Sequence, residues 1–261
     1  MLIIKIGGNI LDNPGRLQRF LVDFAQLQGP KLLVHGGGKI ASAIGQRLGI
    51  TPNMIEGRRI TDAETLELVT MVYGGLVNKQ VVAQLQALGC NAIGLTGADA
   101  NIIPAQKRPV REIDYGFAGD IAGTASINVQ ALQALLKAGL TPVFAPLSHD
   151  TKGSLLNTNA DTIAAALAMA MAPKYKVRLV YCFEKKGVLR DPEDDASVIT
   201  SINSQHYKAL KAEGTITAGM IPKLDNAFAA LEQGVAQVLI GEAEALLTVG
   251  EQYTGTKLQL V

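Results

Sequence analysis

Short apolar runs alternate along the chain with longer stretches of helical pattern. The short runs cover residues 2–6, 32–35, 92–95, 141–145, 177–181 and 237–240. Several are apolar at successive positions, which is typical of parallel strands that are covered on both faces. These segments are therefore predicted to form one buried, mainly parallel sheet.

The longer stretches predict helices over residues 14–28, 62–88, 128–138, 161–171 and 223–233. Alternation of strands and helices, with glycine-rich turns between them, indicates an α/β protein. The expected architecture is a three-layer αβα sandwich with a mainly parallel central sheet. Ligands of such sheets bind beyond the carboxyl ends of the strands, so the loops at those ends are the candidate functional segments.

A proline interrupts the pattern after the helix predicted over residues 161–171, which is rich in alanine and methionine. Pro173 follows this helix, and a new strand begins soon afterwards. Because proline ends a helix, this position predicts a boundary between two lobes, residues 1–172 and residues 173–261.

Composition narrows the class of protein. The chain has 261 residues, of which 48% are hydrophobic and 18% charged, and a formal net charge of +1. These values indicate a globular protein, and the lack of a basic run gives no reason to expect a nucleic-acid partner. No apolar segment is long enough for a membrane span or a signal peptide, and the two cysteines are far apart. A reducing, cytoplasmic location is expected, with no metal site built by the protein itself.

The first candidate loop follows the first predicted strand. Lys5 interrupts an otherwise apolar strand, and Gly7 and Gly8 come directly after it. Glycines let backbone N–H groups approach an anion, and a buried ammonium group needs a charged partner. The glycine pair alone would also suit a tight turn, but Lys5 favours an anion-binding loop.

The second candidate loop reads His-Gly-Gly-Gly-Lys over residues 35–39. It fits the Gly-x-Gly-x-x-Ala pattern of dinucleotide-binding loops, but that pattern requires a second strand ending in an acid about 20 residues on. Residues 49–59 look like a loop instead, and a P-loop is excluded by leucine at position 33 and isoleucine at position 40. We interpret the segment as a second anion-binding turn, in which His35 is a structural hydrogen-bonding residue.

Two polar segments add candidate ligand contacts. Arg59 precedes a possible helix cap at 61–62 and could bind a carboxylate through two hydrogen bonds, or simply lie exposed. Asn157, Asn159 and Asp161 are spaced by two, so that in an extended segment their side chains would share one face. A helix cap alone would need fewer polar groups, which favours a ligand-facing role.

Lys223 follows a turn shaped by Gly219 and Pro222, near the start of a predicted helix. A cation at a helix N-terminus is unfavourable unless an anion is close. Two lysines, two glycine turns, an arginine and an aspartate supply the charge neutralisation that phosphoryl transfer requires. No Ser-His-Asp or Cys-His arrangement is evident.

These loops resemble those of the amino-acid kinase superfamily and, within it, of the acetylglutamate kinases. GRRITD followed by NTNAD is the most specific pair, because it separates acylglutamate kinases from carbamate, uridylate and aspartate kinases. The resemblance covers essentially the whole chain and is carried by IIKIGGN, LLVHGGGK, EGRRITDAETLELV, VNK at 77–79, GLTGADAN, GFAGDI, NTNADT and TAGMIPK.

The resemblance implies an enzyme that uses ATP, with Mg²⁺ carried by the nucleotide, to phosphorylate the γ-carboxylate of N-acetyl-L-glutamate in arginine biosynthesis. It implies catalytic roles for Lys5, Lys223 and Asp161, the aspartate holding both lysines in place. It assigns the acylglutamate to Gly37, Gly38, Arg59, Asn157 and Asn159. It assigns ATP and its phosphates to Gly7, Gly8, Glu184, Gly187, Gly219 and Met220.

The resemblance also implies that residues 1–172 bind the amino acid and form a homodimer, whereas residues 173–261 bind ATP. The sequence departs from the family pattern at Glu184, where the family commonly has an aspartate near the nucleotide, and at Ala218, where Gly or Asp is usual. Arginine-inhibited members carry a helix before the first strand. The chain starts at that strand, so an arginine-insensitive dimer is expected.

Three alternatives remain open from the residues. The acyl group could be larger than acetyl, such as succinyl, because the residues walling the acyl pocket cannot be identified from the sequence. The chain could be a kinase of the same fold for another small anion, or a non-catalytic sensor of acylglutamate or arginine. The presence of Lys5, Lys223 and Asp161 favours a kinase over a sensor.

Overall fold

The computed structural model describes residues 1–55, 58–216, 220–249 and 253–260. Its main sheet has eight strands in the order β12-β14-β13-β11-β1-β2-β8-β5. Neighbouring strands are parallel except for β13 and β14, which are antiparallel. The bounds are β1 Leu2–Ile6, β2 Lys31–His35, β5 Ala92–Leu95, β8 Thr141–Phe144, β11 Arg178–Phe183, β12 Ser201–Asn203, β13 Gln237–Glu242 and β14 Thr256–Gln259. The prediction of a mainly parallel sheet is confirmed.

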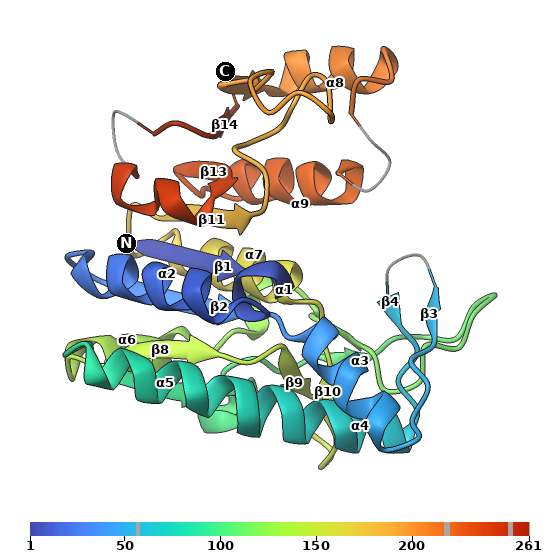
Figure 1. Cartoon of the computed structure of the whole chain (residues 1–261). Coiled ribbons are helices and arrows are strands. Elements are labelled where there is room, and N and C mark those ends of the chain that lie inside the picture. Colours follow the sequence, from blue (N-terminus) through green and yellow to red (C-terminus); the bar gives the residue numbers. More distant parts are fainter. Residues whose placement is uncertain (56–57, 217–219, 250–252, 261) are drawn as a thin grey trace.

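Helices cover both faces of this sheet, as Figure 1 shows. One apolar core contains buried residues of α6, α7, α8 and α9, and the other contains those of α1, α2, α4 and α5. The three-layer αβα prediction is therefore confirmed. The helix bounds are α1 Gly8–Leu11, α2 Pro14–Gln26, α3 Gly38–Arg47, α4 Ala63–Val69, α5 Asn78–Ala87, α6 Val129–Lys137, α7 Ala160–Met171, α8 Ser204–Ala212 and α9 Ile221–Glu232.

Strand β1 lies in the middle of the sheet and alternates between the two cores. Ile3 packs into the core beside α7, whereas Ile4 and Ile6 pack into the core beside α2. Because side chains on a strand point to opposite faces in turn, Lys5 shares the face of Ile3. This alternation directs the Lys5 side chain towards α7.

The predicted helix over residues 62–88 is continuous but not uniform. Asp62 caps α4 by accepting a hydrogen bond from the Thr65 backbone N–H at 2.8 Å. Between α4 and α5, residues Thr70–Val77 form the π-helical segment η1. The apolar periodicity predicted the length of this run but not its wider middle turns.

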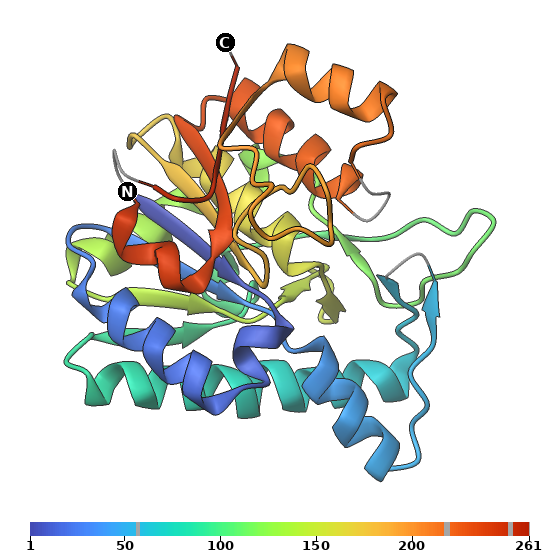
Figure 2. The same cartoon turned by 45° about the horizontal axis from the view of Figure 1, so that its top comes forward.

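Three short hairpins lie outside the main sheet: β3 Met54–Ile55 with β4 Arg58–Arg59, β6 Gln106–Lys107 with β7 Gly119–Asp120, and β9 Leu147–His149 with β10 Leu155–Asn157. In both Figure 1 and Figure 2 the β3–β4 hairpin and the loop between β6 and β7 extend together from one end of the molecule. The sequence analysis treated residues 49–59 as a loop, so the β3–β4 hairpin was not predicted.

The predicted lobe boundary near Pro173 does not interrupt the sheet. Strand β11, which follows the boundary, pairs in parallel with β1 along its whole length. The division of binding roles between residues 1–172 and 173–261 stays a prediction. In the described part of the chain, none of the helices combines the length and the apolar character needed to cross a membrane.

Candidate active site

Lys5 and Asp161 form the central ion pair of the candidate site. Lys5 Nζ lies 2.7 Å from Asp161 Oδ1, and the two side chains are 9% and 13% exposed. Asp161 lies in the first turn of α7, the helix that covers the Lys5 face of β1. A buried ammonium group requires such a partner, so the strand interruption noted in the sequence is explained.

Lys223 approaches the same carboxylate. It lies in the first turn of α9, and its Nζ is 3.9 Å from Asp161 Oδ2. Burial lowers the pKa of Lys223 from its ordinary value, Asp161 acts to raise it, and Lys5 lowers it further. One carboxylate thus lies between two ammonium groups, and the group of three keeps a net positive charge.

Phe183 forms one wall of this cluster. The ring lies 4.0 Å from Lys223 Nζ and 5.5 Å from Lys5 Nζ, both within cation–π distance. Phe183 is the last residue of β11, the strand next to β1. No role was predicted for Phe183, because its place beside the two lysines comes from tertiary structure.

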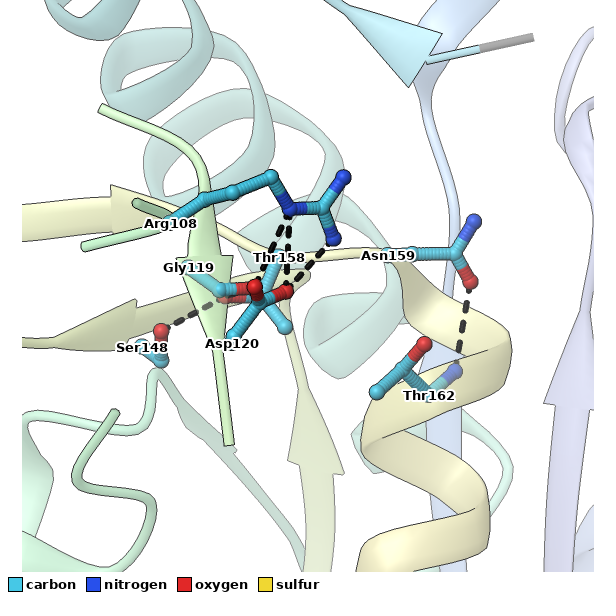
Figure 3. A network of polar contacts seen from close by, with 7 residues as sticks. All are labelled: Arg108, Gly119, Asp120, Ser148, Thr158, Asn159 and Thr162. Carbon is cyan, nitrogen blue, oxygen red and sulfur yellow. Dashed lines mark hydrogen bonds and ion pairs between the residues drawn. The ribbon is translucent and has the colours of Figure 1, made fainter. Parts of the chain in front are cut away.

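The segment with the two asparagines leads into α7. Asn157 is the last residue of β10, and its Nδ2 donates to Thr61 Oγ1 at 3.0 Å. Asn159 caps α7, since its Oδ1 accepts from the backbone N–H groups of Asp161 and Thr162. Figure 3 shows the second of these hydrogen bonds.

The expectation that an extended segment places both asparagines and Asp161 on one face was wrong for Asp161. Helix α7 begins at Ala160, so a helical turn directs this carboxylate. The hydrogen bonds that the Asn159 cap accepts fix the start of that turn. It thereby fixes the position of the carboxylate that holds both lysines.

Arg59 is a buried cation with neutral partners. It is 8% exposed, and its Nη2 donates to Gly38 O at 3.0 Å and to Ser42 Oγ at 2.7 Å. No carboxylate of the described residues lies within ion-pair distance of its guanidinium. Since burying an uncompensated charge is costly, the environment of Arg59 suits an anionic ligand.

A cavity of about 140 Å³ opens beside Arg59, and we call it the inner cavity. It brings together four residues that the sequence assigned to the acylglutamate, which are Gly38, Arg59, Asn157 and Asn159. Five other residues complete its wall: Met54, Arg58, Arg108, Ala118 and Gly119.

Arg58 and Arg108 are charged wall residues that the sequence analysis did not assign. Gly119 lies in the GFAGDI stretch that carried part of the resemblance, so this stretch was a usable signal for the neighbouring β6–β7 hairpin.

A second cavity, of about 280 Å³, is lined in part by Phe183, and we call it the apolar cavity. Three residues assigned to ATP from the sequence line it: Glu184, Gly187 and Met220. The remaining wall is mostly apolar, formed by Phe183, Lys185, Val188, Leu189, Pro192, Thr215 and Ile216. Gly219 lies outside the described residues.

The lysine cluster connects the two cavities. Asn159 lines the inner cavity and caps α7, whose Asp161 binds Lys5 and Lys223. Phe183 contacts both lysines and lines the apolar cavity. One residue of each cavity wall thus contacts or positions a member of the lysine cluster.

The glycine turns lie at the same end of the sheet. A side chain on Gly7 would meet Lys5 Nζ at 3.7 Å, and Gly8 begins α1 directly after it. Gly37 has a φ of +147°, and its substituent would meet the Tyr73 ring at 3.0 Å. Gly7, Gly8 and Gly37 line neither cavity, but glycine is required at position 37 for conformation and space.

His35 has a structural position. It is fully buried, and since a carbonyl only accepts, its Nδ1 donates to Gly36 O at 2.7 Å. Its Nε2 accepts from Asn78 Nδ2 at 3.1 Å. Burial lowers the pKa of His35 to about 4, so the ring is neutral at pH 7. The interpretation of His35 as a structural hydrogen-bonding residue is confirmed.

Comparison with known proteins places this site in a family. A profile described as "Amino acid kinase family" matches residues 1–242. An acetylglutamate kinase of Cytophaga hutchinsonii is 58% identical over 261 residues, covering 99% of this chain and 98% of the relative. An acetylglutamate kinase of Phocaeicola vulgatus is 56% identical over 246 residues, covering 94% and 95%.

A solved structure shares the fold as well. The N-acetylglutamate synthase of Neisseria gonorrhoeae, in complex with coenzyme A and N-acetyl-glutamate, superposes with a TM-score of 0.80 at 25% identity. The similarity covers 99% of this chain but 59% of the synthase, so the synthase has a further part with no counterpart here. The chain belongs to the amino acid kinase family, and both of the relatives named above are acetylglutamate kinases.

Proposed function

We propose that the chain is a kinase that transfers the γ-phosphoryl group of ATP to the γ-carboxylate of N-acetyl-L-glutamate. Such a reaction is a step of arginine biosynthesis. The family and the relatives at 53–58% identity support this function. The structural observation that carries it is the Asp161 carboxylate between the ammonium groups of Lys5 and Lys223.

The chemistry needs little from the protein beyond position and charge. A γ-carboxylate oxygen forms a bond to the γ-phosphorus, the bond from that phosphorus to the β,γ-bridging oxygen breaks, and ADP leaves with the electron pair. The attacking carboxylate is already ionised at neutral pH, so no general base is required. The products are an acyl phosphate and ADP, and the barrier is set mainly by charge repulsion and alignment.

Lys5 and Lys223 would neutralise the negative charge of the transferring group and its oxygens. Asp161 would hold them on either side of that group, and its single negative charge leaves one positive charge uncompensated. Phe183 would exclude water from one side of the cluster while still stabilising the ammonium groups. Preorganised donors of this kind act where charge develops in the transition state.

The acylglutamate would occupy the inner cavity. Arg59 is buried among neutral partners, which supports a contact with the α-carboxylate. Asn157 and Asn159 line the same cavity and offer amide groups to the acyl amide, and Gly38 offers backbone. With the α-carboxylate at Arg59, the γ-carboxylate would extend towards the lysine cluster.

ATP would occupy the apolar cavity, and use of ATP follows from membership of a kinase family. Its apolar wall suits an adenine ring, and Glu184 can accept hydrogen bonds from ribose hydroxyl groups. Gly187 must be a glycine for packing, since a Cβ would lie 2.6 Å from Thr256 Oγ1. Mg²⁺ carried by the nucleotide would neutralise part of the phosphate charge.

The assembly and location are proposed on the resemblance alone. A homodimer formed by residues 1–172 and a cytoplasmic location are typical of the relatives' family. Sedimentation of the purified chain tests the first.

An ADP-release assay with a substrate panel tests the function. The panel sets N-acetyl-L-glutamate against glutamate, carbamate, uridylate and aspartate, each with MgATP. Hydroxylamine added to the reaction converts an acyl phosphate to a hydroxamate, which identifies the carboxylate as the acceptor. Turnover restricted to an acceptor other than an acylglutamate would refute the proposal, as would binding of N-acetyl-L-glutamate without ADP release.

A further inference from the structure

A third cavity, of about 610 Å³, adjoins the inner cavity, and we call it the outer cavity. Arg58 and Arg108 line both cavities. The outer cavity lies between the β3–β4 hairpin and the loop that joins β6 to β7, which extend together in Figures 1 and 2. Its wall is formed by Arg58, Arg108, Pro109, Arg111, Glu112, Ile113, Tyr115 and Asp120.

The arginines of this wall are not all neutralised. Arg108 is paired with Asp120, its Nε lying 3.2 and 3.1 Å from the two carboxylate oxygens (Figure 3). Arg58 and Arg111 have no carboxylate within ion-pair distance among the described residues. Glu112 also lies on the wall, so among the described wall residues three arginines face two carboxylates, an excess of one positive charge.

The proposed reaction does not account for these charges. The inference rests on the proposed function. In that function N-acetyl-L-glutamate has two carboxylates, and each has a partner in the protein. The γ-carboxylate meets the lysine cluster and the α-carboxylate meets Arg59, which leaves the neutral acetyl methyl group. An acetyl group gives Arg58 and Arg111 no charge to bind, although Arg58 lines the inner cavity.

We propose that Arg58, Arg108 and Arg111 form a carboxylate-binding subsite that takes the far end of the substrate's acyl chain. The substrate class would extend to N-acylglutamates whose acyl chain ends in a carboxylate, of which N-succinyl-L-glutamate is the simplest test compound. Guanidinium groups bind carboxylates through paired hydrogen bonds, and the Arg108–Asp120 pair holds one of them in a fixed orientation.

The experiment compares three substrates in the ADP-release assay with the full chain and saturating MgATP. They are N-acetyl-, N-succinyl- and N-succinamoyl-L-glutamate, the last being the uncharged amide that matches the succinyl compound in size. The expected kcat/KM is about 10-fold higher for the succinyl compound than for its amide, the difference expected of one charge-assisted contact.

Arg111→Gln tests the residues, since Arg111 lies on the outer cavity and not on the inner one. This variant should reduce the ratio of kcat/KM for the succinyl compound over its amide to about 2-fold or less, the loss of most of one ionic contact. Arg19→Gln is the matched control, because Arg19 is an exposed arginine on α2. It should keep the wild-type ratio, and circular dichroism verifies that both variants are folded.

Equal kcat/KM for the succinyl compound and its amide would overturn the inference, as would an Arg111→Gln variant with the wild-type ratio. Free succinate added with N-acetyl-L-glutamate distinguishes a separate anion from an acyl carboxylate. The inference is overturned if free succinate raises turnover in the wild type but not in Arg111→Gln, while the succinyl compound has no higher kcat/KM than its amide. If N-acetyl-L-glutamate is turned over but the succinyl compound is no better than its amide, the subsite inference fails and the proposed function stands. If no acylglutamate is turned over, the proposed function is refuted as well.

Discussion

Lys5 and Lys31 are equally buried lysines, each 7% exposed, on the neighbouring parallel strands β1 and β2, and they lie near opposite ends of the sheet. Lys31 Nζ donates to three backbone carbonyl oxygens at the end of α2, at 2.8, 3.0 and 2.6 Å. It satisfies groups that a helix C-terminus leaves unpaired. Lys5 instead shares a carboxylate with Lys223 beside two cavities. The two lysines are equally buried, but Lys31 ends a helix, whereas Lys5 belongs to the proposed catalytic cluster.

The two lysines are expected to respond differently to the same substitution. Lys5→Met should lower kcat by roughly 100-fold or more, because it removes a preorganised cation from the transferring phosphoryl group. Lys31→Met should lower the free energy of unfolding by about 1–3 kcal/mol, because buried carbonyl oxygens lose their donor. Its kcat per folded molecule should stay close to wild type. Steady-state kinetics and urea unfolding of both variants make the comparison, and near-normal kcat in Lys5→Met would contradict the assignment of Lys5.

The pH dependence of activity should report Lys223. Its pKa is lowered from the ordinary value of 10.5, chiefly by burial, so the ammonium is lost at lower pH than in an ordinary lysine. Activity that needs the charged form should therefore fall as the pH rises through this lowered pKa. Bound phosphates favour the ammonium, so the alkaline fall in kcat/KM for ATP should begin at lower pH than the fall in kcat.

Lys223→Arg is the test variant for this pH dependence. Arginine stays charged throughout the range, so the alkaline fall should disappear even if turnover is reduced. Rates are measured in buffers of constant ionic strength, with Lys208→Arg as a control on the neighbouring α8. If the alkaline fall is the same in Lys223→Arg and wild type, another group is responsible for it.

Much of the fold could be predicted because it follows from local pattern. The runs at residues 2–6 and 92–95 coincide with β1 and β5, since apolar residues fill both runs except at Lys5 and Gly94. Strands β12 and β14 were not predicted. Ile202 and Leu258 are buried at 0% exposure, but polar residues flank them, so neither segment has an apolar run. Their pairing depends on the rest of the sheet.

The candidate site was predictable only in part. Lys5 was a candidate because it is a charged residue in an apolar strand, and Lys223 because it is a cation near a helix N-terminus. Only the family resemblance implied that Asp161 holds both. Phe183 and Arg108 carried no comparable local signal. Their positions come from tertiary structure, one at the end of the strand beside β1 and the other on a hairpin that reaches the inner cavity.

Stability at acidic pH should depend on His35. Burial lowers its pKa to about 4 from the ordinary 6.5, so between these values the unfolded chain binds a proton that the folded protein does not. The free energy of unfolding should therefore be fully retained above pH 6.5 and should decrease as the pH falls towards 4. The expected loss from this residue is about 3 kcal/mol. Urea unfolding at several pH values measures it.

The comparison variant is His35→Gln, which keeps hydrogen-bonding groups near Gly36 and Asn78 but cannot titrate. The difference in unfolding free energy between wild type and this variant should shrink on acidification, because only the wild type loses stability through the imidazole. A difference that stays constant from pH 7 to pH 4 would mean that other groups cause the acid loss.

Arg59 should control the affinity for the acyl amino acid and not the affinity for ATP. Its guanidinium donates to Gly38 O and Ser42 Oγ, and these hydrogen bonds fix the plane of the guanidinium group. Lysine would keep the charge but lose paired donation, so Arg59→Lys should raise the KM for N-acetyl-L-glutamate by about 10- to 100-fold. Ser42→Ala removes one positioning contact of the guanidinium and should raise this KM less. In both variants the KM for ATP should stay near its wild-type value, because the apolar cavity lies beyond the lysine cluster. An equal rise in both KM values would instead indicate that Arg59 supports the fold of the whole site.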